Sequence, residues 1–203
     1  MGPVPLTKTP EFGYERKGII FVAIFFYDRT VNRHQPGGIY MSKIWVNKGY
    51  IPGSIGRIVE LHGAYYHRHW GFDLYFEAMV ATDISGFLKR YNRSRDGFWT
   101  ITENGRVEGT ISIDGVHATG QGAHLRWFII SEKLQGKGLG RQLIDTAIDF
   151  CLEKHYSTVY LWTFEGLRVA RKLYEKKGFV QVAQEAGTEW GVKVNEQRLV
   201  LKL

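Results

Sequence analysis

A glycine-rich segment between an apolar run and a helical pattern is the part of the sequence best suited to chemistry. It reads Gln135-Gly136-Lys137-Gly138-Leu139-Gly140-Arg141. Glycines ahead of a helix leave backbone N–H groups free to converge on an anion, and the helix N-terminus adds partial positive charge. Lys137 and Arg141 bring formal charge to the same place. The segment predicts a pyrophosphate site, although a plain strand-to-helix turn would need similar glycines.

Residue spacing excludes two common phosphate-binding motifs. A Walker loop needs a lysine followed directly by Ser or Thr, and Lys137 is followed by Gly138. A dinucleotide fingerprint needs Gly-x-Gly-x-x-Gly, whereas the glycines here are Gly136, Gly138 and Gly140. The sequence therefore favours a different class of pyrophosphate ligand.

Composition and charge limit the class of protein further. The chain has 203 residues, of which 44% are hydrophobic, so it can bury a sizeable core. Its single cysteine, Cys151, excludes an intramolecular disulfide and a cysteine-built zinc site, and fits a reducing compartment. The longest apolar run, Ile19–Tyr27, is far shorter than the roughly 20 residues of a membrane span. We expect a soluble, cytoplasmic protein, and the net charge of +7 favours an anionic partner.

The chain divides near Met41. Residues 1–40 contain four of the five prolines and one strand-like run, Gly18–Tyr27. From Met41 the pattern is continuous to the end. We interpret residues 1–40 as an N-terminal extension, either upstream of a native start at Met41 or an arm whose strand adds to a sheet edge. Residues 41–203 are interpreted as one domain.

Strand and helix periodicities alternate from Met41 onward. The predicted strands are Lys43–Ile51, Phe98–Thr102, Val107–Ile113, His124–Ile130, Val159–Thr163, Phe179–Ala183 and Asn195–Leu203. One predicted helix is N-capped by Ser54, a second by Asp73, a third follows the glycine loop, and a fourth covers Leu167–Lys177. Leu74 is predicted on the apolar stripe of the helix capped by Asp73, and Leu152 on that of the helix after the glycine loop. The order predicts an α/β fold, a mixed sheet with helices on its faces.

Two motifs in this order give a resemblance to a known family. Gln135-x-x-Gly138-x-Gly140 after an apolar strand, and then Leu-Tyr-Glu-Lys-Lys-Gly-Phe at 173–179, resemble the GNAT superfamily of N-acetyltransferases. The likeness covers roughly residues 98–203. Residues 62–77 are also similar to the acetyltransferase half of fused MarR-type regulator/GNAT proteins. The resemblance implies a mixed, mostly antiparallel central sheet with helices on both faces.

The resemblance also implies a function and its residues. The chain would bind acetyl-CoA, with the loop 135–141 on the pyrophosphate and the backbone of Phe128, Ile129 and Ile130 paired with the pantetheine arm. An amine would attack the thioester directly, and Tyr174 would be the general acid. Acetyl-CoA and an amine acceptor are the implied partners of a monomer or homodimer, with no metal, nucleic acid or membrane.

The sequence departs from the family pattern at several positions. Leu167 stands where an asparagine is common, Glu132 where a proline is common, and no glutamate lies within His124–Ile130. The general base therefore stays open. The candidates are Glu77, Glu103, Glu165, His124 and a water chain. These departures keep a second hypothesis, an acetyl-CoA sensor with little transferase activity.

Aromatic and basic clusters have both functional and structural interpretations. In the family, the region holding Tyr65, Tyr66, Trp70, Phe72 and Glu77 shapes the acceptor pocket, and helix packing is the alternative. Three nearby histidines favour a solvated or substrate-facing cluster over zinc, because no third ligand has suitable spacing; they are His62, His67 and His69.

Three further features have simple packing or charge explanations. Cys151 is expected in the core, and Tyr174 shares a helical stripe with Leu167 and Ala170, so packing is an alternative to catalysis. Five cations on the helix before Gly178 favour CoA phosphates over a nucleic-acid face; they are Arg168, Arg171, Lys172, Lys176 and Lys177.

Overall fold

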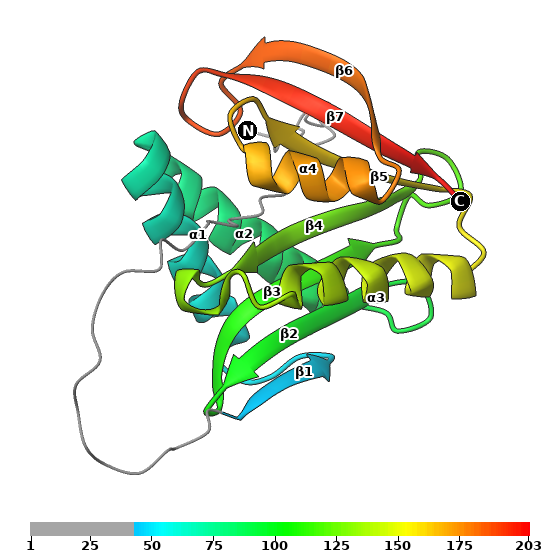
Figure 1. Cartoon of the computed structure of the whole chain (residues 1–203), viewed down its shortest axis with the longest axis horizontal. Coiled ribbons are helices and arrows are strands. Elements are labelled where there is room, and N and C mark those ends of the chain that lie inside the picture. The colour runs from blue at the N-terminus through cyan, green and yellow to red at the C-terminus, as the bar shows by residue number, and fades with distance from the viewer. Residues whose placement is uncertain (1–42) are drawn as a thin grey trace, which may run out of the picture.

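The computed structural model describes residues 43–203 and shows one seven-stranded sheet in the order β1-β2-β3-β4-β5-β7-β6 (Figure 1). The strands are β1 (Ile44–Lys48), β2 (Gly97–Glu103), β3 (Arg106–Asp114), β4 (Ala123–Ile130), β5 (Thr158–Phe164), β6 (Val180–Gly187) and β7 (Val194–Lys202). β4 and β5 are parallel, and every other neighbouring pair is antiparallel. The predicted mixed, mostly antiparallel sheet is confirmed. The predicted extension, residues 1–40, lies outside the described residues.

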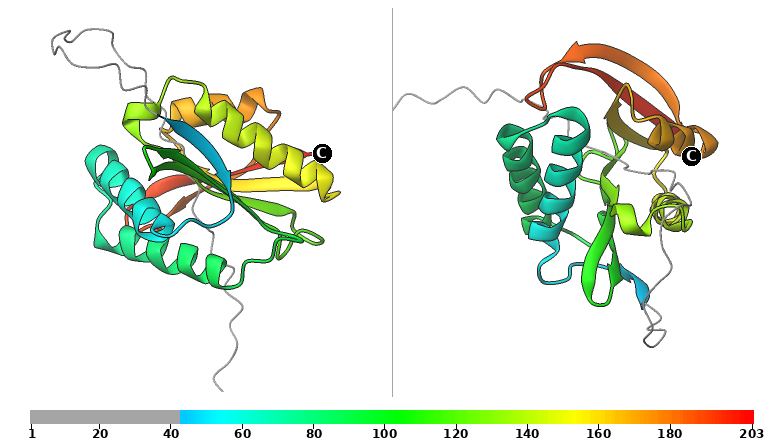
Figure 2. Two further views of the ribbon diagram at one scale, coloured as in Figure 1. Left: turned by 90° about the horizontal axis from the view of Figure 1, so that it is seen from below. Right: turned by 60° about the vertical axis from the view of Figure 1, so that its left-hand side comes forward.

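Helices cover both faces of the sheet (Figure 2). They are α1 (Ser54–Trp70), α2 (Leu74–Lys89), α3 (Leu139–Glu153) and α4 (Arg168–Lys176), with a short 3₁₀ turn η1 (Glu132–Leu134). α1 and α2 pack together on one face, and α3 lies on the other. None of the helices between residues 43 and 203 is long and apolar enough to cross a bilayer.

Turn chemistry explains where several elements begin and end. Asn104 and Gly105 both have positive φ (51° and 81°), as the tight hairpin between β2 and β3 requires. Gly71 ends α1 in the left-handed region at φ 69°. The carboxylate of Asp73 caps α2 by accepting the N–H of Tyr75 at 3.2 Å, as predicted.

Three local predictions were wrong. Gly53, at φ 88°, is the N-cap of α1, and the Ser54 hydroxyl instead donates to the Ile51 carbonyl at 2.6 Å. Leu74 is 80% exposed, because the Asp73 cap places it in the outward part of the first turn. Leu152 is 51% exposed, and Phe150 takes the buried position in that turn of α3.

β4 and β5 separate after a short paired stretch. Only Ala123–Val159 and His124–Tyr160 pair between them, while β4 stays paired with β3 as far as Ile130. A β-bulge lies where β4 has left β5. The β3–β4 register shifts there between Thr110 and Ser112 of β3, and Trp127 of β4 has φ 45°. The result is an open V whose β4 side carries backbone groups that β5 does not use.

Candidate active site

The main cleft lies beside the open end of the V and has a volume of about 880 Å³, within the range of small-ligand sites. It is bounded by the end of β4, the glycine loop, the first turn of α3 and one face of α4. The lining residues are Ile130, Leu134, Gln135, Gly136, Gly138, Leu139, Gly140, Arg141, Arg168, Val169, Lys172, Leu173, Lys176 and Lys177.

The glycine loop presents unused backbone donors to this cleft. Gly136 (φ 73°) and Gly138 (φ 81°), the N-cap of α3, adopt conformations that other residues rarely reach. Gln142 is the first to donate into the helix, to the Gly138 carbonyl at 3.1 Å, and the amides of 136–141 make no backbone bond to another described residue. Such amides at a helix N-terminus form an anion site.

One side-chain bond fixes the loop to the strand before it. Gln135 Nε2 donates to the Ile130 carbonyl at 2.9 Å. The loop is therefore held against the last residue of β4, where the V is open. This places the loop amides and the part of the β4 edge that β5 does not pair with in one cleft.

The charge lining the cleft is wholly positive. The lining cations are Arg141, Arg168, Lys172, Lys176 and Lys177, and no Asp or Glu is among the lining residues. Lys177 also forms an ion pair with Asp145. Arg171 is different, because it faces away from the cleft and bonds Gln181 at 2.6 Å and Gln197 at 3.0 Å. Four of the five cations predicted to favour a phosphorylated ligand thus line the cleft.

The structure brings most of the predicted cofactor residues together. Ile130 and six residues of the loop line the cleft, whereas Phe128, Ile129 and Lys137 do not. Phe128 and Ile129 have buried side chains on β4, and their backbone lies along the part of β4 that β5 does not pair with. Lys137 is exposed at the tip of the loop.

Tyr174 is fully buried on α4, with its ring 6.4 Å from Phe128 and 5.7 Å from Phe179. Burial raises the pKa of its hydroxyl well above the usual 10. That hydroxyl has no hydrogen-bond partner among the described residues. Tyr174 is therefore protonated at neutral pH and has an unused donor, which are the properties of a general acid.

An aromatic cluster lies on the α1–α2 side of the V. Its members are Tyr65, Tyr66, Trp70, Phe72, Phe76, Phe164 and Trp190. Tyr66 is fully buried, and burial raises its pKa well above the usual 10. Glu77 lies apart from the cluster, exposed on α2 against Gly63 of α1, where a Cβ would be 2.9 Å from its Oε2.

The predicted histidine cluster does not form. His62 is fully buried rather than solvated, its Nδ1–H donates to the Ile58 carbonyl at 2.8 Å, and burial lowers its pKa to about 4. His67 contacts the Phe72 carbonyl and His69 contacts Glu132. Within residues 43–203, no three His, Cys, Asp or Glu side chains are grouped to hold a metal. Cys151 is buried, as predicted, and burial raises its pKa to about 12.

The remaining base candidates have different surroundings. Glu103 pairs with Lys133 at 2.9 Å at the end of β2, two strands from the V. Glu165 accepts from Asn195 Nδ2 at 2.7 Å just after β5. His124 stacks on Tyr160, with 4.3 Å between ring centroids, at the closed end of the V.

One buried carboxylate was missed by sequence reasoning. Glu196 on β7 is fully buried and lies opposite Phe164 in the β5–β7 register. Only the alternation along Asn195–Leu203 could have indicated an inward position. Which face it points to depends on pairing with β5, a segment more than 30 residues earlier in the chain.

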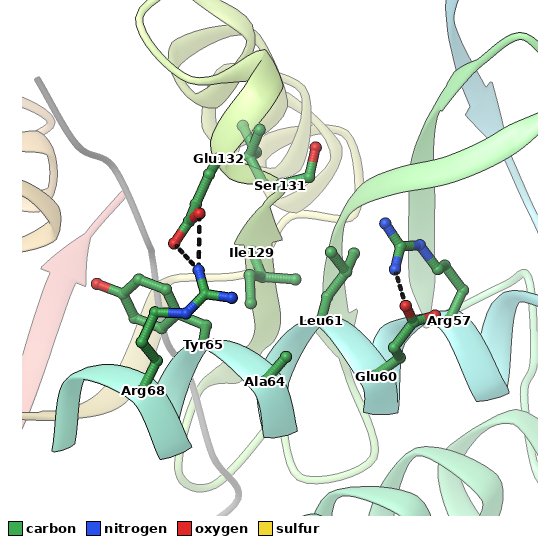
Figure 3. Close-up of a pocket in the computed structure, with 10 residues that line it drawn as sticks. Arg57, Glu60, Leu61, Ala64, Tyr65, Arg68, Ile129, Ser131 and Glu132 are labelled. Carbon is green, nitrogen blue, oxygen red and sulfur yellow. Dashed lines mark hydrogen bonds and ion pairs between the residues drawn. The ribbon is translucent and has the colours of Figure 1, made fainter. Parts of the chain in front are cut away.

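A smaller pocket of about 130 Å³ lies between α1 and the end of β4 (Figure 3). Its charged residues are paired: Arg57 with Glu60 at 2.7 Å, and Arg68 with Glu132 at 2.9 Å. Arg57 also binds the buried Glu108 of β3 at 2.8 Å. Arg57–Glu108 links α1 to β3, and Arg68–Glu132 links α1 to η1 just after β4. Glu132, which replaces a common proline, thus has a structural role here.

Comparison with known proteins agrees with this architecture. The family model described as Acetyltransferase (GNAT) family matches residues 55–179. An N-acetylaspartate synthetase from Xenopus tropicalis is 29% identical over 110 residues, covering 53% of this chain and 40% of that protein. Rat N-acetyltransferase 8 is 28% identical over 114 residues, covering 54% of this chain and 51% of that protein. The chain thus spans about half or less of these relatives.

Solved structures share the fold at lower identity. The ribosomal-protein-S18-alanine N-acetyltransferase from Escherichia coli superposes with a TM-score of 0.57 at 17% identity, covering 79% of this chain and 94% of the other. A structure of yncA from Salmonella typhimurium with its cofactor acetyl-CoA gives a TM-score of 0.61, with the same identity and coverages. The chain belongs to the GNAT acetyltransferase family, since the family model matches more than half of it. That family uses acetyl-CoA as the acyl donor.

Proposed function

We propose that this protein transfers the acetyl group of acetyl-CoA to a primary amine by direct attack. The observation that carries the proposal is the main cleft, where free loop amides and five cations meet the unpaired edge of β4. A pyrophosphate fits the amides and the cations. An amide-bearing arm fits the strand edge, because it hydrogen-bonds like a neighbouring strand.

The proposed assignments follow the order of the cofactor's parts. The pyrophosphate binds at Gln135–Arg141, and the pantetheine arm pairs with the backbone of Phe128, Ile129 and Ile130. The thioester then lies near the bulge at Trp127, where a backbone N–H near Phe128 polarises the carbonyl. Most of the rate enhancement would come from holding the two substrates together in one cleft.

Tyr174 protonates the departing thiolate in this proposal. Its hydroxyl is buried, protonated and without a partner among the described residues, which supports the role, and its contact with Phe128 supports a position beside the expected thioester. The aromatic cluster on the opposite side of the V forms the acceptor pocket. Of the residues predicted for that pocket, Tyr65, Tyr66, Trp70 and Phe72 are in the cluster.

The acceptor class is proposed from the relatives. Their names refer to N-acetylaspartate and to the alanine of a ribosomal protein. We therefore propose the α-amine of an amino acid or peptide. The likeness to MarR-type fusion proteins and the cytoplasmic location stay predictions.

Thermal unfolding with and without acetyl-CoA tests the cofactor. A ligand at 100 times its Kd adds about 2.7 kcal/mol to the free energy of unfolding, which raises Tm by roughly 5–11 °C for a chain of this size. ATP and NAD serve as controls. Thiol release with L-aspartate, an alanine-initiated peptide and spermidine then tests transfer. The absence of any shift with acetyl-CoA would overturn the proposal.

A sensor without efficient transfer is the second candidate, supported by Leu167 and by the lack of a glutamate on β4. The Tyr174→Phe variant separates the two. For an enzyme we expect kcat to fall about 100-fold, with the acetyl-CoA shift in Tm unchanged. Tyr50→Phe, at an exposed site near β1, is the matched control and should keep full activity. An unchanged kcat in Tyr174→Phe would remove Tyr174 from the mechanism.

A further inference from the structure

Glu196 is a buried carboxylate whose position is set by the sheet. It pairs with Phe164 of β5, and side chains directly opposite on antiparallel strands point to the same face. Phe164 contacts Tyr66 and Phe72, so this face is the α1–α2 side. The next residue, Gln197, bonds Arg171 of α4 on the other side. Glu196 therefore points away from the main cleft and toward the aromatic cluster.

The sequence leaves room for this carboxylate beside β6. Gly187 carries no side chain, and a Cβ there would overlap Oε1 of Glu196. Phe164, opposite Glu196, lies 5.6 Å from Trp190 and 4.7 Å from Trp70 between ring centroids. The arrangement combines a desolvated carboxylate with several aromatic rings.

Such a combination suits an ammonium group. A carboxylate gives a charge-assisted hydrogen bond, and aromatic faces attract a cation within about 6 Å of the ring centre. Among the described residues, the ionisable side chains on the same face include Glu185 of β6, Arg198 two residues along β7, and Tyr66 of α1. Arg198 lies over the Tyr160 ring at 4.7 Å, toward the closed end of the V.

We propose that Glu196 is a catalytic residue: it binds the ammonium group of the acceptor on the α1–α2 side of the V and takes one proton from it. This inference rests on the proposed transferase function. The donor enters from the α3–α4 side, so the amine and the leaving thiolate lie on opposite sides of the thioester carbonyl. The amine can then add to one face of the thioester carbonyl without crossing the bound donor.

The proton balance of the step is complete. The carboxylate of Glu196 takes one proton from the ammonium, and the amine lone pair forms the C–N bond to the thioester carbon. The C–S bond breaks, and the thiolate takes the proton of Tyr174. The second proton on nitrogen and the proton on Glu196 pass to solvent, and the Tyr174 phenolate takes one proton back from solvent. The products are the amide, CoA and one proton.

The test compares wild type with Glu196→Gln, using the panel amine that wild type acetylates fastest. We expect kcat/KM for the amine to fall about 100-fold at pH 7, with the acetyl-CoA shift in Tm retained. The pH profile is decisive. Glu196→Gln cannot deprotonate the ammonium and therefore depends on free amine, whose fraction rises about tenfold per pH unit below the amine pKa. The difference in kcat/KM between the variant and wild type should therefore shrink toward pH 9.5. Glu185→Gln, the residue opposite on β6, is the matched control and should behave as wild type.

The outcomes separate this inference from the function beneath it. Wild type without an acetyl-CoA shift and without transfer would overturn both. If wild type is active, the pH profile of kcat/KM in Glu196→Gln decides the role of Glu196 alone. A profile equal to that of wild type, or lower by the same factor at every pH, would overturn that role. If Glu196→Gln does not fold, Glu196→Asp replaces it. It should keep the wild-type pH profile at reduced kcat/KM, and a profile rising tenfold per unit would overturn the proposal.

Discussion

His62 shows how burial alone sets the protonation of a side chain. It has no exposed surface, and its Nδ1–H is held by the Ile58 carbonyl at 2.8 Å. The opposite nitrogen, Nε2, has no partner among the described residues. Protonation would place a charge in this apolar setting, so burial lowers the pKa of His62 to about 4 from 6.5.

This pKa predicts acid sensitivity of the fold. Between pH 6.5 and 4 the unfolded chain binds a proton at His62 and the folded chain does not. The stabilisation is therefore fully present above pH 6.5 and is lost as the pH falls. The expected loss from His62 by pH 4 is about 3 kcal/mol in the free energy of unfolding. Urea unfolding at stepped pH measures it.

Two variants isolate the contribution of His62. His62→Phe keeps a ring and removes the titration, so its free energy of unfolding should fall less steeply between pH 6.5 and 4. His117→Gln, at an exposed turn position, should keep the wild-type slope. An equal slope in His62→Phe and wild type would show that other groups cause the acid sensitivity.

At the scale of elements, α4 divides its cations between two faces. Lys172 and Lys176 line the main cleft, whereas Arg171 bonds Glu175, Gln181 and Gln197 beside β6 and β7. Sequence reasoning grouped these cations as one cluster. The helical period separates them, and the sheet determines which face meets the cleft.

This division predicts that removing a charge from one face of α4 weakens acetyl-CoA binding, whereas removing a charge from the other face lowers Tm. Lys172→Gln should weaken acetyl-CoA binding about 3- to 10-fold and lessen its salt dependence, because one phosphate-attracting charge is lost. Arg171→Gln should leave Kd unchanged but lower Tm by a few degrees, because Gln181 and Gln197 lose a charged donor. Titration calorimetry at two salt concentrations and thermal unfolding measure both effects. Equal Kd values for Lys172→Gln and wild type would contradict the placing of the phosphates.

How far the sequence predicts the molecule depends on the range of the interaction. Local signals were sufficient for the Asn104-Gly105 hairpin, the Asp73 cap and the glycine loop, because each is decided by neighbouring residues. The prediction that Ser54 caps α1 was wrong, because Gly53 adopts the left-handed conformation and is itself the N-cap. The Ser54 hydroxyl therefore donates to the Ile51 carbonyl instead. Glu196 was missed because its environment depends on strand register, on Gly187 and on helices distant in sequence.

At the scale of the whole molecule, the sheet consists of two parts joined by few backbone contacts. β1–β4 form one part and β5–β7 the other, and only two residue pairs connect β4 with β5. The main cleft contains groups from both, the loop after β4 and the cation face of α4 after β5. A ligand there would supply contacts between the parts that the strands themselves do not make.

Hydrogen exchange tests this arrangement directly. Acetyl-CoA should slow exchange of the 136–141 amides, which make no backbone bond to another described residue, and of the amides in Phe128–Ile130 that face the V. The β2 amides paired with β1, such as those between Ile101 and Glu103, should show no comparable local protection, because they already lie within a paired ladder far from the cleft. Protection confined to the loop would mean that only the phosphates bind as proposed. Protection of both segments together would show that the ligand takes the place of the missing strand pairing between β4 and β5.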